Sequence, residues 1–161
     1  MNSTSQTDIE ITPILKKNEN QTVGDGRNEL LADYTTFHQN VKGLHRNFQG
    51  TDYFNFHQKF EDLCEKLNLD INNLTEQIAL FGYEPLLSYS GFFKNSIQKE
   101  ITAPNTYREC LMYVIEGLKS LIFSITMAAN TVEEKGKRKI VRQFGSELEN
   151  ELWVFTMLAK Y

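Results

Sequence analysis

The chain is short of the residues and segments that mark several protein classes. It has two cysteines and three prolines among 161 residues, which excludes a disulfide-stapled scaffold and a proline-rich linker. No apolar run approaches the length of a membrane span, and the first thirty residues lack a basic start followed by an apolar block, so we expect neither a membrane span nor a secretory signal. The formal charge of −4 disfavours a general nucleic-acid binder. These features indicate one cytoplasmic globular domain in which Cys64 and Cys110 are buried, reduced thiols.

The first 26 residues differ in composition from the rest of the chain. They are rich in Asn, Ser, Thr and Gln, contain one apolar cluster between Ile9 and Leu15, and end in Gly24-Asp25-Gly26. Such a composition cannot bury enough apolar surface to form a packed core. We therefore expect a flexible polar tail over residues 1–26 and one helical domain over residues 27–161.

Four segments carry apolar residues at alternating spacings of three and four, which is the pattern of helices that each bury one face. They span roughly residues 30–48, 53–81, 107–132 and 141–158. Gly82 stands where the second helix should stop, because glycine is the usual residue just beyond a helix end. The sequence therefore predicts an all-α domain.

Connection lengths set the topology of these four helices. The first two are joined by a few residues around Gly50 and the last two around Gly136, so each pair should be antiparallel. The second and third are separated by about twenty residues, enough to run the length of the bundle and make these two helices parallel. A four-helix bundle with one long crossover is the ferritin-like arrangement. The apolar residues of PLLSYSGFFKNS, from Pro85 to Ser96, predict a short helix within that crossover.

The second helix should carry a polar stripe. At about 100° per residue, four of its polar side chains fall within an arc of about 100°: His57, Glu61, Asn72 and Glu76. The two ends of this stripe are about 28 Å apart along the helix axis, so one ion cannot bind both ends in one chain. If the ends share a metal, a second copy must run antiparallel around a two-fold axis near Lys66 and Leu67.

The segment from His45 to Ile78 resembles the ligand segment of the Dps family, the DNA-protecting mini-ferritins. In that family a histidine closes one helix, and an NxxG turn and an aromatic pair follow. A second histidine then opens the next helix, a carboxylate lies one turn on, and the segment ends in a D-x-x-A-E-R-I phrase. Here those places read His45, Asn47-Phe48-Gln49-Gly50, Tyr53-Phe54, His57, Glu61 and Asn72-Asn73-Leu74-Thr75-Glu76-Gln77-Ile78. The resemblance covers roughly residues 28–160, and it implies that the short crossover helix packs at a dimer interface.

This resemblance implies a hollow shell of twelve copies, built from two-fold dimers, that binds, oxidises and stores iron and protects DNA under stress. It implies a cytoplasmic and nucleoid-associated protein. The ferroxidase site would lie between subunits, with its metal ligands His45, His57 and Glu61 from one chain and Asn72 and Glu76 from the other. All of these except Asn72 would be catalytic. Imidazole and carboxylate suit Fe²⁺ and Fe³⁺, and Zn²⁺ is a second candidate ion. Neither histidine is preceded by glutamate in a Glu-x-x-His pattern, so a ferritin site inside one bundle is not supported.

Two departures from the family pattern predict a ferroxidase of reduced competence. Asn72 offers a neutral amide oxygen where a carboxylate is usual, and Arg46 replaces a tryptophan with a cation that raises the cost of binding a metal. One alternative is therefore a Dps-like shell that lacks ferroxidase activity and has a structural, carrier or binding role. Another is a small helical protein that binds Zn²⁺ at His45 and His57. The third histidine, His38, is expected to be a core or surface residue rather than a ligand.

A basic segment runs from Lys135 to Arg142, at the junction of the last two helices. In Dps-like proteins this junction lines a three-fold pore, usually with acidic residues. Three interpretations stay open: solvated charge at a helix start, a pore that repels Fe²⁺, and a phosphate or DNA contact. The candidate contact residues for the last are Lys137, Arg138, Lys139 and Arg142. The tail adds only Lys16 and Lys17, so DNA association is expected to be weak.

Overall fold

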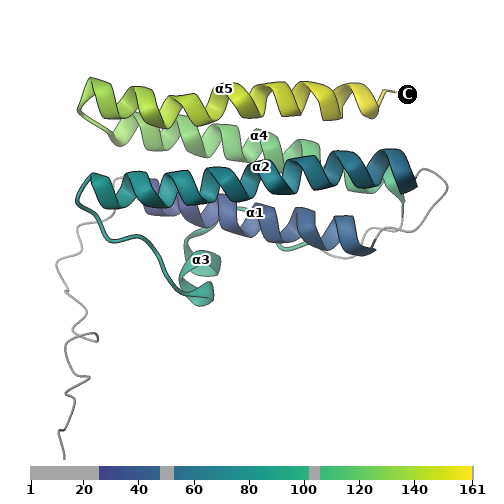
Figure 1. The fold of residues 1–161 in the computed structure, drawn as a ribbon, viewed down its shortest axis with the longest axis horizontal. Helices are drawn as coiled ribbons and strands as arrows, with labels where there is room; N and C mark the ends of the chain where they lie inside the picture. The colour runs from purple at the N-terminus through teal and green to yellow at the C-terminus, as the bar shows by residue number, and fades with distance from the viewer. Residues whose placement is uncertain (1–25, 48–52, 102–105, 161) are drawn as a thin grey trace, which may run out of the picture.

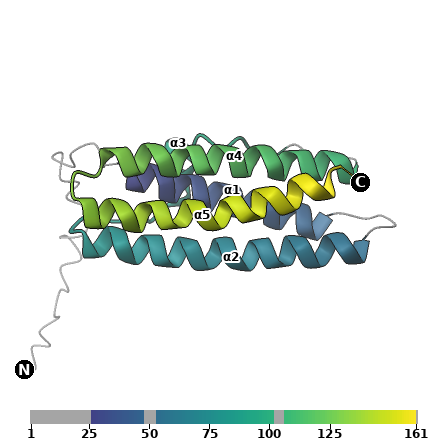
Figure 2. The same cartoon turned by 90° about the horizontal axis from the view of Figure 1, so that it is seen from above.

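The fold is known from a computed structural model, which describes residues 26–47, 53–101 and 106–160. This part of the chain contains five helices and no strands: α1 (Arg27–Asn47), α2 (Tyr53–Leu80), α3 (Tyr89–Asn95), α4 (Tyr107–Thr131) and α5 (Lys135–Leu158). The four long helices lie side by side as a bundle (Figures 1 and 2). The predicted all-α fold is confirmed. The expected tail over residues 1–26 falls, except for Gly26, outside the described residues.

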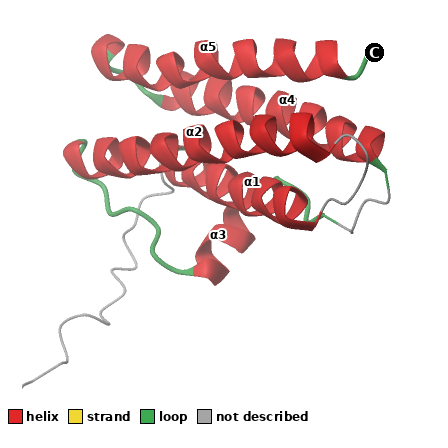
Figure 3. Cartoon of the chain, turned by 45° about the vertical axis from the view of Figure 1, so that its right-hand side comes forward, coloured by secondary structure: helices red, strands yellow, loops and turns green. Residues whose placement is uncertain are grey.

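The directions of the helices also agree with the predicted topology. α1 and α5 run one way along the bundle, and α2 and α4 run the other way (Figure 1). α1 packs against α2 and α4, and α4 packs against α5. The connection between α2 and α4 carries α3, which lies beside α1 outside the bundle (Figure 3). The one long crossover and its short helix are therefore both present.

The bundle core consists of the apolar stripes that the sequence marked. Leu30, Tyr34, Phe37 and Val41 of α1 are fully buried, as are most of the expected positions on the other long helices. α1 and α4 approach closely at Gly117, where an added Cβ would lie 2.2 Å from Cε2 of Phe37. The rings of Phe60 on α2 and Phe155 on α5 also meet edge to face across the bundle. A continuous core therefore fixes the position of α2, which carries the polar stripe, relative to the other helices.

Gly82 ends α2 as predicted. It has a φ of +85°, and the backbone N–H of Gly82 donates to the carbonyl of Ala79 while that of Tyr83 donates to the carbonyl of Ile78. This pair of bonds is the Schellman ending, which needs a left-handed residue that glycine adopts without strain. The start of α4 is fixed by a capping box between Thr106 and Glu109.

Asp33 attaches the crossover to the bundle. Its buried carboxylate accepts hydrogen bonds from the Ser96 hydroxyl at 2.8 Å, the Ile97 amide at 2.7 Å and the Ser124 hydroxyl at 2.6 Å. A buried carboxylate is costly unless its oxygens are bonded, and here three donors from α4 and the crossover satisfy it. Asp33 therefore holds the end of α3 against α1.

α4 is the most apolar of the four long helices. This helix is long and apolar enough, by length and composition, to cross a membrane, and no other helix in the described residues is. Its apolar face, with Val114, Leu118, Leu121 and Ile125, is buried against the other helices. The core helix of a bundle passes the same test of composition, because a helix that is apolar on most of its surface suits either setting.

Both cysteines are free thiols. Cys110 is buried as expected, whereas Cys64 on α2 is only half-buried. Burial raises the pKa of each thiol to about 11. Both therefore stay protonated at neutral pH and are poor nucleophiles.

Candidate metal centre

Two histidines and a glutamate meet where the chain reverses between α1 and α2. His45 lies in the last turn of α1, His57 in the second turn of α2, and Glu61 one turn further on. One ligand atom from each of the three lies within 4.8 Å of the others. The two imidazole rings stack with centroids 4.1 Å apart and planes 2° from parallel. The structure therefore brings three of the predicted ligand residues together at one end of the bundle.

The chemistry of this cluster suits a transition-metal ion. The Nε2 atom of His45 is buried and has no hydrogen-bond partner among the described residues. The pKa of His45 is lowered, first by burial and then by the neighbouring charges of His57 and Arg46, against the opposing effect of Glu61. A neutral imidazole is the form that binds a metal, and two imidazoles with one carboxylate are a ligand set for ferrous iron or zinc.

The other two predicted ligands lie far from this cluster in the same chain. Asn72 and Glu76 are exposed on α2, about 17 Å and 23 Å from Glu61 along the helix axis at about 1.5 Å per residue. One chain thus brings together three of the five predicted ligands. The other two can join the cluster only from a second copy.

The expected two-fold axis near Lys66 and Leu67 needs one refinement. Leu67 is fully buried in the core and Lys66 points toward α5, where it bonds Glu147. Neither residue therefore lies on the face that a second copy would contact. At the level of these two residues, the outward face of α2 carries Asn68 and Leu69, whose side chains are exposed.

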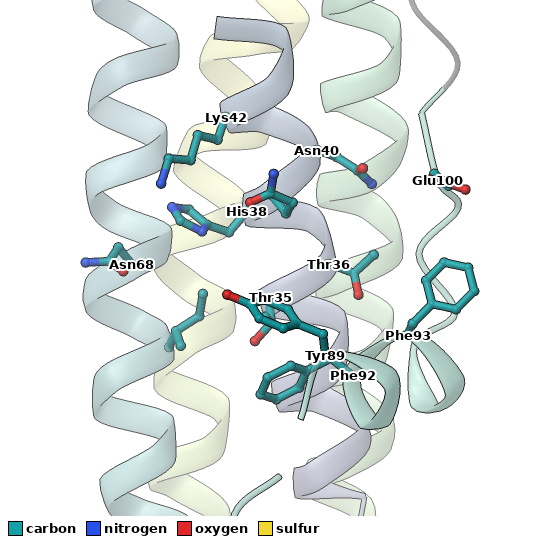
Figure 4. Close-up of a pocket in the computed structure, with 12 residues that line it drawn as sticks. Thr35, Thr36, His38, Asn40, Lys42, Asn68, Tyr89, Phe92, Phe93 and Glu100 are labelled. Carbon is teal, nitrogen blue, oxygen red and sulfur yellow. The ribbon is translucent and has the colours of Figure 1, made fainter. Parts of the chain in front are cut away.

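A groove of about 460 Å³ opens beside the same outward face, between α1, α2 and α3 (Figure 4). His38 and Lys42 line it from α1, Asn68 from α2, and Tyr89 and Phe92 from α3. Burial and the charge of Lys42 lower the pKa of His38. His38 therefore lines this groove and lies outside the His45 cluster.

The basic segment lies at the opposite end of the bundle from the histidines (Figure 1). Arg138 donates from Nε to the carbonyl of Val132 at 2.9 Å and from Nη2 to that of Glu133 at 3.3 Å. Lys137 pairs with Glu134 at 2.9 Å and lies 5.2 Å from the Phe81 ring centroid. Two of the four candidate phosphate contacts thus have partners in their own chain. The other two, Lys139 and Arg142, are exposed.

A second polar cluster, which the sequence did not predict, lies between α1, α2 and α5, with Asp70 buried and Glu147 exposed. Lys66 of α2 bonds Glu147 of α5 and lies 3.5 Å from Asp70 of its own helix. The buried hydroxyl of Tyr34 on α1 faces the carboxylate of Asp70. Burial raises the pKa of Asp70 to about 6, with Glu147 adding to the rise and Lys66 opposing it. The only signal in the sequence was the Lys66–Asp70 spacing of one helical turn.

Comparison with known proteins identifies the family to which this four-helix bundle belongs. The family model described as "Ferritin-like domain" matches residues 27–160. A protein named "DNA protection during starvation protein" from Porphyromonas gingivalis is 30% identical over 153 residues, which is 95% of this chain and 96% of that protein. The chain belongs to the Dps family of ferritin-like proteins.

Other members of the Dps family and their relatives agree with this placement. The crystal structure of a Dps protein from Vibrio cholerae O1 superposes with a TM-score of 0.78 at 28% identity, over 83% of this chain and 86% of that one. That protein is described as a member of a broad superfamily of ferritin-like diiron-carboxylate proteins. An uncharacterized protein from Haemophilus influenzae is 34% identical over 144 residues, which is 88% of this chain and 90% of that protein. The resemblance inferred from His45 to Ile78 is therefore confirmed at the level of the family.

Proposed function

We propose that this Dps-family chain binds Fe²⁺ between subunits, oxidises it slowly with oxygen or peroxide, and stores the product inside a shell of twelve copies. The observation that carries the proposal is the convergence of His45, His57 and Glu61 within 4.8 Å. Two imidazoles and one carboxylate leave coordination positions open for the oxidant and for ligands from a second chain. Iron is the substrate and the cargo of such a site.

A second copy completes the site in this proposal. An antiparallel α2 from the partner brings Asn72 and Glu76 of that copy to the His45 cluster of the first, and the two-fold axis makes a second, equal site. The outward face of α2 suits such packing, because Leu69 is 59% exposed and the groove beside Asn68 has aromatic walls from α3. Exposed apolar surface of this kind usually marks an interface.

The neutral amide at Asn72 is the reason to expect slow oxidation. A ferric ion is better balanced by two carboxylates than by one carboxylate and an amide, and the amide cannot become anionic at ordinary pH. The same feature, together with Arg46, favours the second candidate function, a Dps-like shell that holds divalent ions such as Zn²⁺ but has lost ferroxidase activity.

Protection of DNA belongs to the proposal only as a weak, salt-sensitive association. Of the four candidate residues, Lys139 and Arg142 are exposed, whereas Arg138 bonds the carbonyl at the end of α4 and Lys137 pairs with Glu134. Phosphate contacts release counterions, so binding should fade as salt rises. A gel shift that is unchanged from low to high salt, or unaffected by reversing the charges of Lys139 and Arg142, contradicts this part of the proposal.

The experiment that tests the main proposal follows oxygen- or peroxide-driven Fe²⁺ oxidation by absorbance, beside titration of Fe²⁺ into the apo protein. Asn72→Asp should raise both the oxidation rate and the iron affinity, and Glu76→Ala should abolish oxidation. Asn73→Asp is the matched control, because it adds the same charge outside the polar stripe. If Asn72→Asp and Asn73→Asp behave alike, Asn72 does not face the metal and the proposed site is wrong.

A further inference from the structure

The outward face of α4 carries two large apolar side chains that no other described residue covers. Phe123 is 58% exposed, and Met127, one helical turn further on, is 52% exposed. We call these two residues the α4 patch. Apolar side chains that adjoin on a surface mark an interaction site more often than scattered ones do. The α4 patch therefore calls for an occupant.

The chain enters the helical domain beside this patch. Gly26, the first described residue, has a φ of +78° and lies close against the last turns of α4. A Cβ added to Gly26 would lie 3.1 Å from Cα of Ala128, the residue that directly follows Met127. Phe123 lies only about 8 Å further along the helix axis. The part of the chain that precedes Gly26 is therefore tethered at the α4 patch.

That part of the chain contains one segment whose composition suits an apolar surface. Four apolar residues stand close together in a stretch that is otherwise polar: Ile9, Ile11, Ile14 and Leu15. Eleven residues separate Leu15 from Gly26 in number, and such a length spans at most about 40 Å. The tether is therefore long enough to bring residues 9–15 onto the patch. Because the two partners belong to one chain, their effective concentration is high.

The charges on both sides agree in their order. In the tail, Asp8 and Glu10 stand at the start of the apolar segment, and two lysines follow its end. On α4, the exposed Lys119 lies one turn before the patch, whereas the exposed Glu133 and the negative end of the helix dipole follow it. A segment that runs in the same direction as α4 therefore brings opposite charges together at both ends of the patch.

We propose that residues 9–15 dock on the α4 patch of their own chain. The proposed metal site takes no part in this contact, so the two proposals stand or fall separately. Burial of apolar surface favours docking, and the ordering of the segment opposes it. Because these two contributions are similar in size, a single substitution on either side of the contact shifts the balance measurably.

Photo-crosslinking in the full-length protein tests the contact. Phe123 is replaced by benzoylphenylalanine, which keeps an aromatic side chain in the patch. In a control chain the same replacement is made at Trp153, an exposed aromatic residue near the other end of the bundle on α5. Mass spectrometry maps the products, and assemblies mixed from isotope-labelled and unlabelled chains separate crosslinks within a chain from those between chains. We expect the Phe123 position, and not the Trp153 position, to crosslink to residues 9–15 of its own chain.

Substitutions in the tail give this experiment a matched pair of variants. Ile11→Ser combined with Ile14→Ser should lower the yield of that crosslink at least about tenfold, because burial of one branched side chain alone is worth such a factor. Asn18→Ser combined with Asn20→Ser, which changes polar residues of the same tail, should leave the yield unchanged. Equal yields from the two pairs, or from the two crosslinker positions, overturn the proposal. So do crosslinks from the Phe123 position to helices of another copy, which would make the patch an interface between copies, and crosslinks to the tail of another copy.

Trypsin gives a second readout that needs no crosslinker. Cleavage after Lys16 and Lys17 follows the population of undocked tail when docking is fast relative to cleavage. Phe123→Ser should therefore speed this cleavage by about tenfold, whereas Trp153→Ser, which removes an exposed aromatic side chain elsewhere, should not change it. Equal cleavage rates in native protein and Phe123→Ser overturn the proposal.

Discussion

Two polar clusters on the same helix differ in one respect that decides what each can do. Near the start of α2, His57 and Glu61 meet His45, and this cluster contains no lysine or arginine. In the middle of α2, Asp70 and Glu147 meet around the ammonium of Lys66. The second cluster carries its own cation, which pairs with both carboxylates. The first has none, so it stays open to a metal ion.

The comparison also shows two ways in which a bundle accommodates polar groups. A buried carboxylate is costly unless it is paired, and Lys66 offsets part of that cost for Asp70 inside one chain. The His45 cluster lies at the end of the bundle, half-buried, where neutral imidazoles carry little cost until a metal binds. One cluster therefore contributes to folding, and the other is available for function.

Removal of a ligand from the open cluster gives the largest expected effect. Glu61→Gln should weaken Fe²⁺ or Co²⁺ binding by more than about 100-fold, because loss of an outer partner of a ligand alone costs 10–100-fold. The free energy of unfolding should change by less than about 0.5 kcal/mol. Glu149→Gln, an exposed change of the same charge on α5, is the control for metal titration and denaturation. Tight metal binding by Glu61→Gln would remove Glu61 from the site.

Removal of the cation from the closed cluster should have the opposite profile. Lys66→Met leaves Asp70 as a buried carboxylate without its cation, which should lower the free energy of unfolding by about 3 kcal/mol, with unchanged metal affinity. Lys119→Met, which breaks an exposed pair with Glu116 at 2.8 Å, should cost less than about 1 kcal/mol. Urea denaturation measures both, and equal losses would show that the Lys66 cluster contributes no more than a surface pair.

The sequence predicts the features that depend on spacing within one segment, but not the contacts between segments that are far apart in the chain. The apolar stripes, the Gly82 stop and the crossover follow from spacing along one segment, and so does the polar stripe of α2. His45 and His57 came together because a short reversal joins their helices. The Lys66 cluster could not be predicted, because Glu147 lies on a helix far along the chain and its facing depends on how α5 packs. The same holds for Asp33, whose donors come from the crossover and α4, and for Arg138, which resembled a free cation in sequence.

The smallest expected effect is a dependence of stability on pH that arises from Asp70. Its pKa of about 6 in the folded chain is above the ordinary value of 3.8. The folded state therefore retains the proton longer than the unfolded state. This contribution to stability is fully present below pH 4 and is lost as pH rises through 6. The shift corresponds to about 3 kcal/mol, which solvent screening around the partly exposed cluster reduces to about 2 kcal/mol.

Denaturation of native protein and Asp70→Asn at pH 4.5, 5.5 and 6.5 checks this contribution. The native protein should lose stability relative to Asp70→Asn across that range. A difference that stays constant, or that grows in favour of the native protein, would mean that Asp70 ionises at least as readily in the folded chain as in the unfolded one.

The central claim is that the open cluster is completed by a second chain, and complementation between two defective chains tests it most directly. His57→Ala and Glu76→Ala are each expected to abolish Fe²⁺ oxidation in assemblies of one variant. When the two variants are unfolded together and reassembled, a mixed dimer has one site with both residues intact and one site that lacks both. Random mixing should therefore restore about a quarter of the sites, measured as the rate of Fe²⁺ oxidation relative to native protein treated in the same way. No recovery in mixed assemblies whose composition is verified by mass would contradict the account, because it would show that His57 of one chain and Glu76 of the other do not form one site.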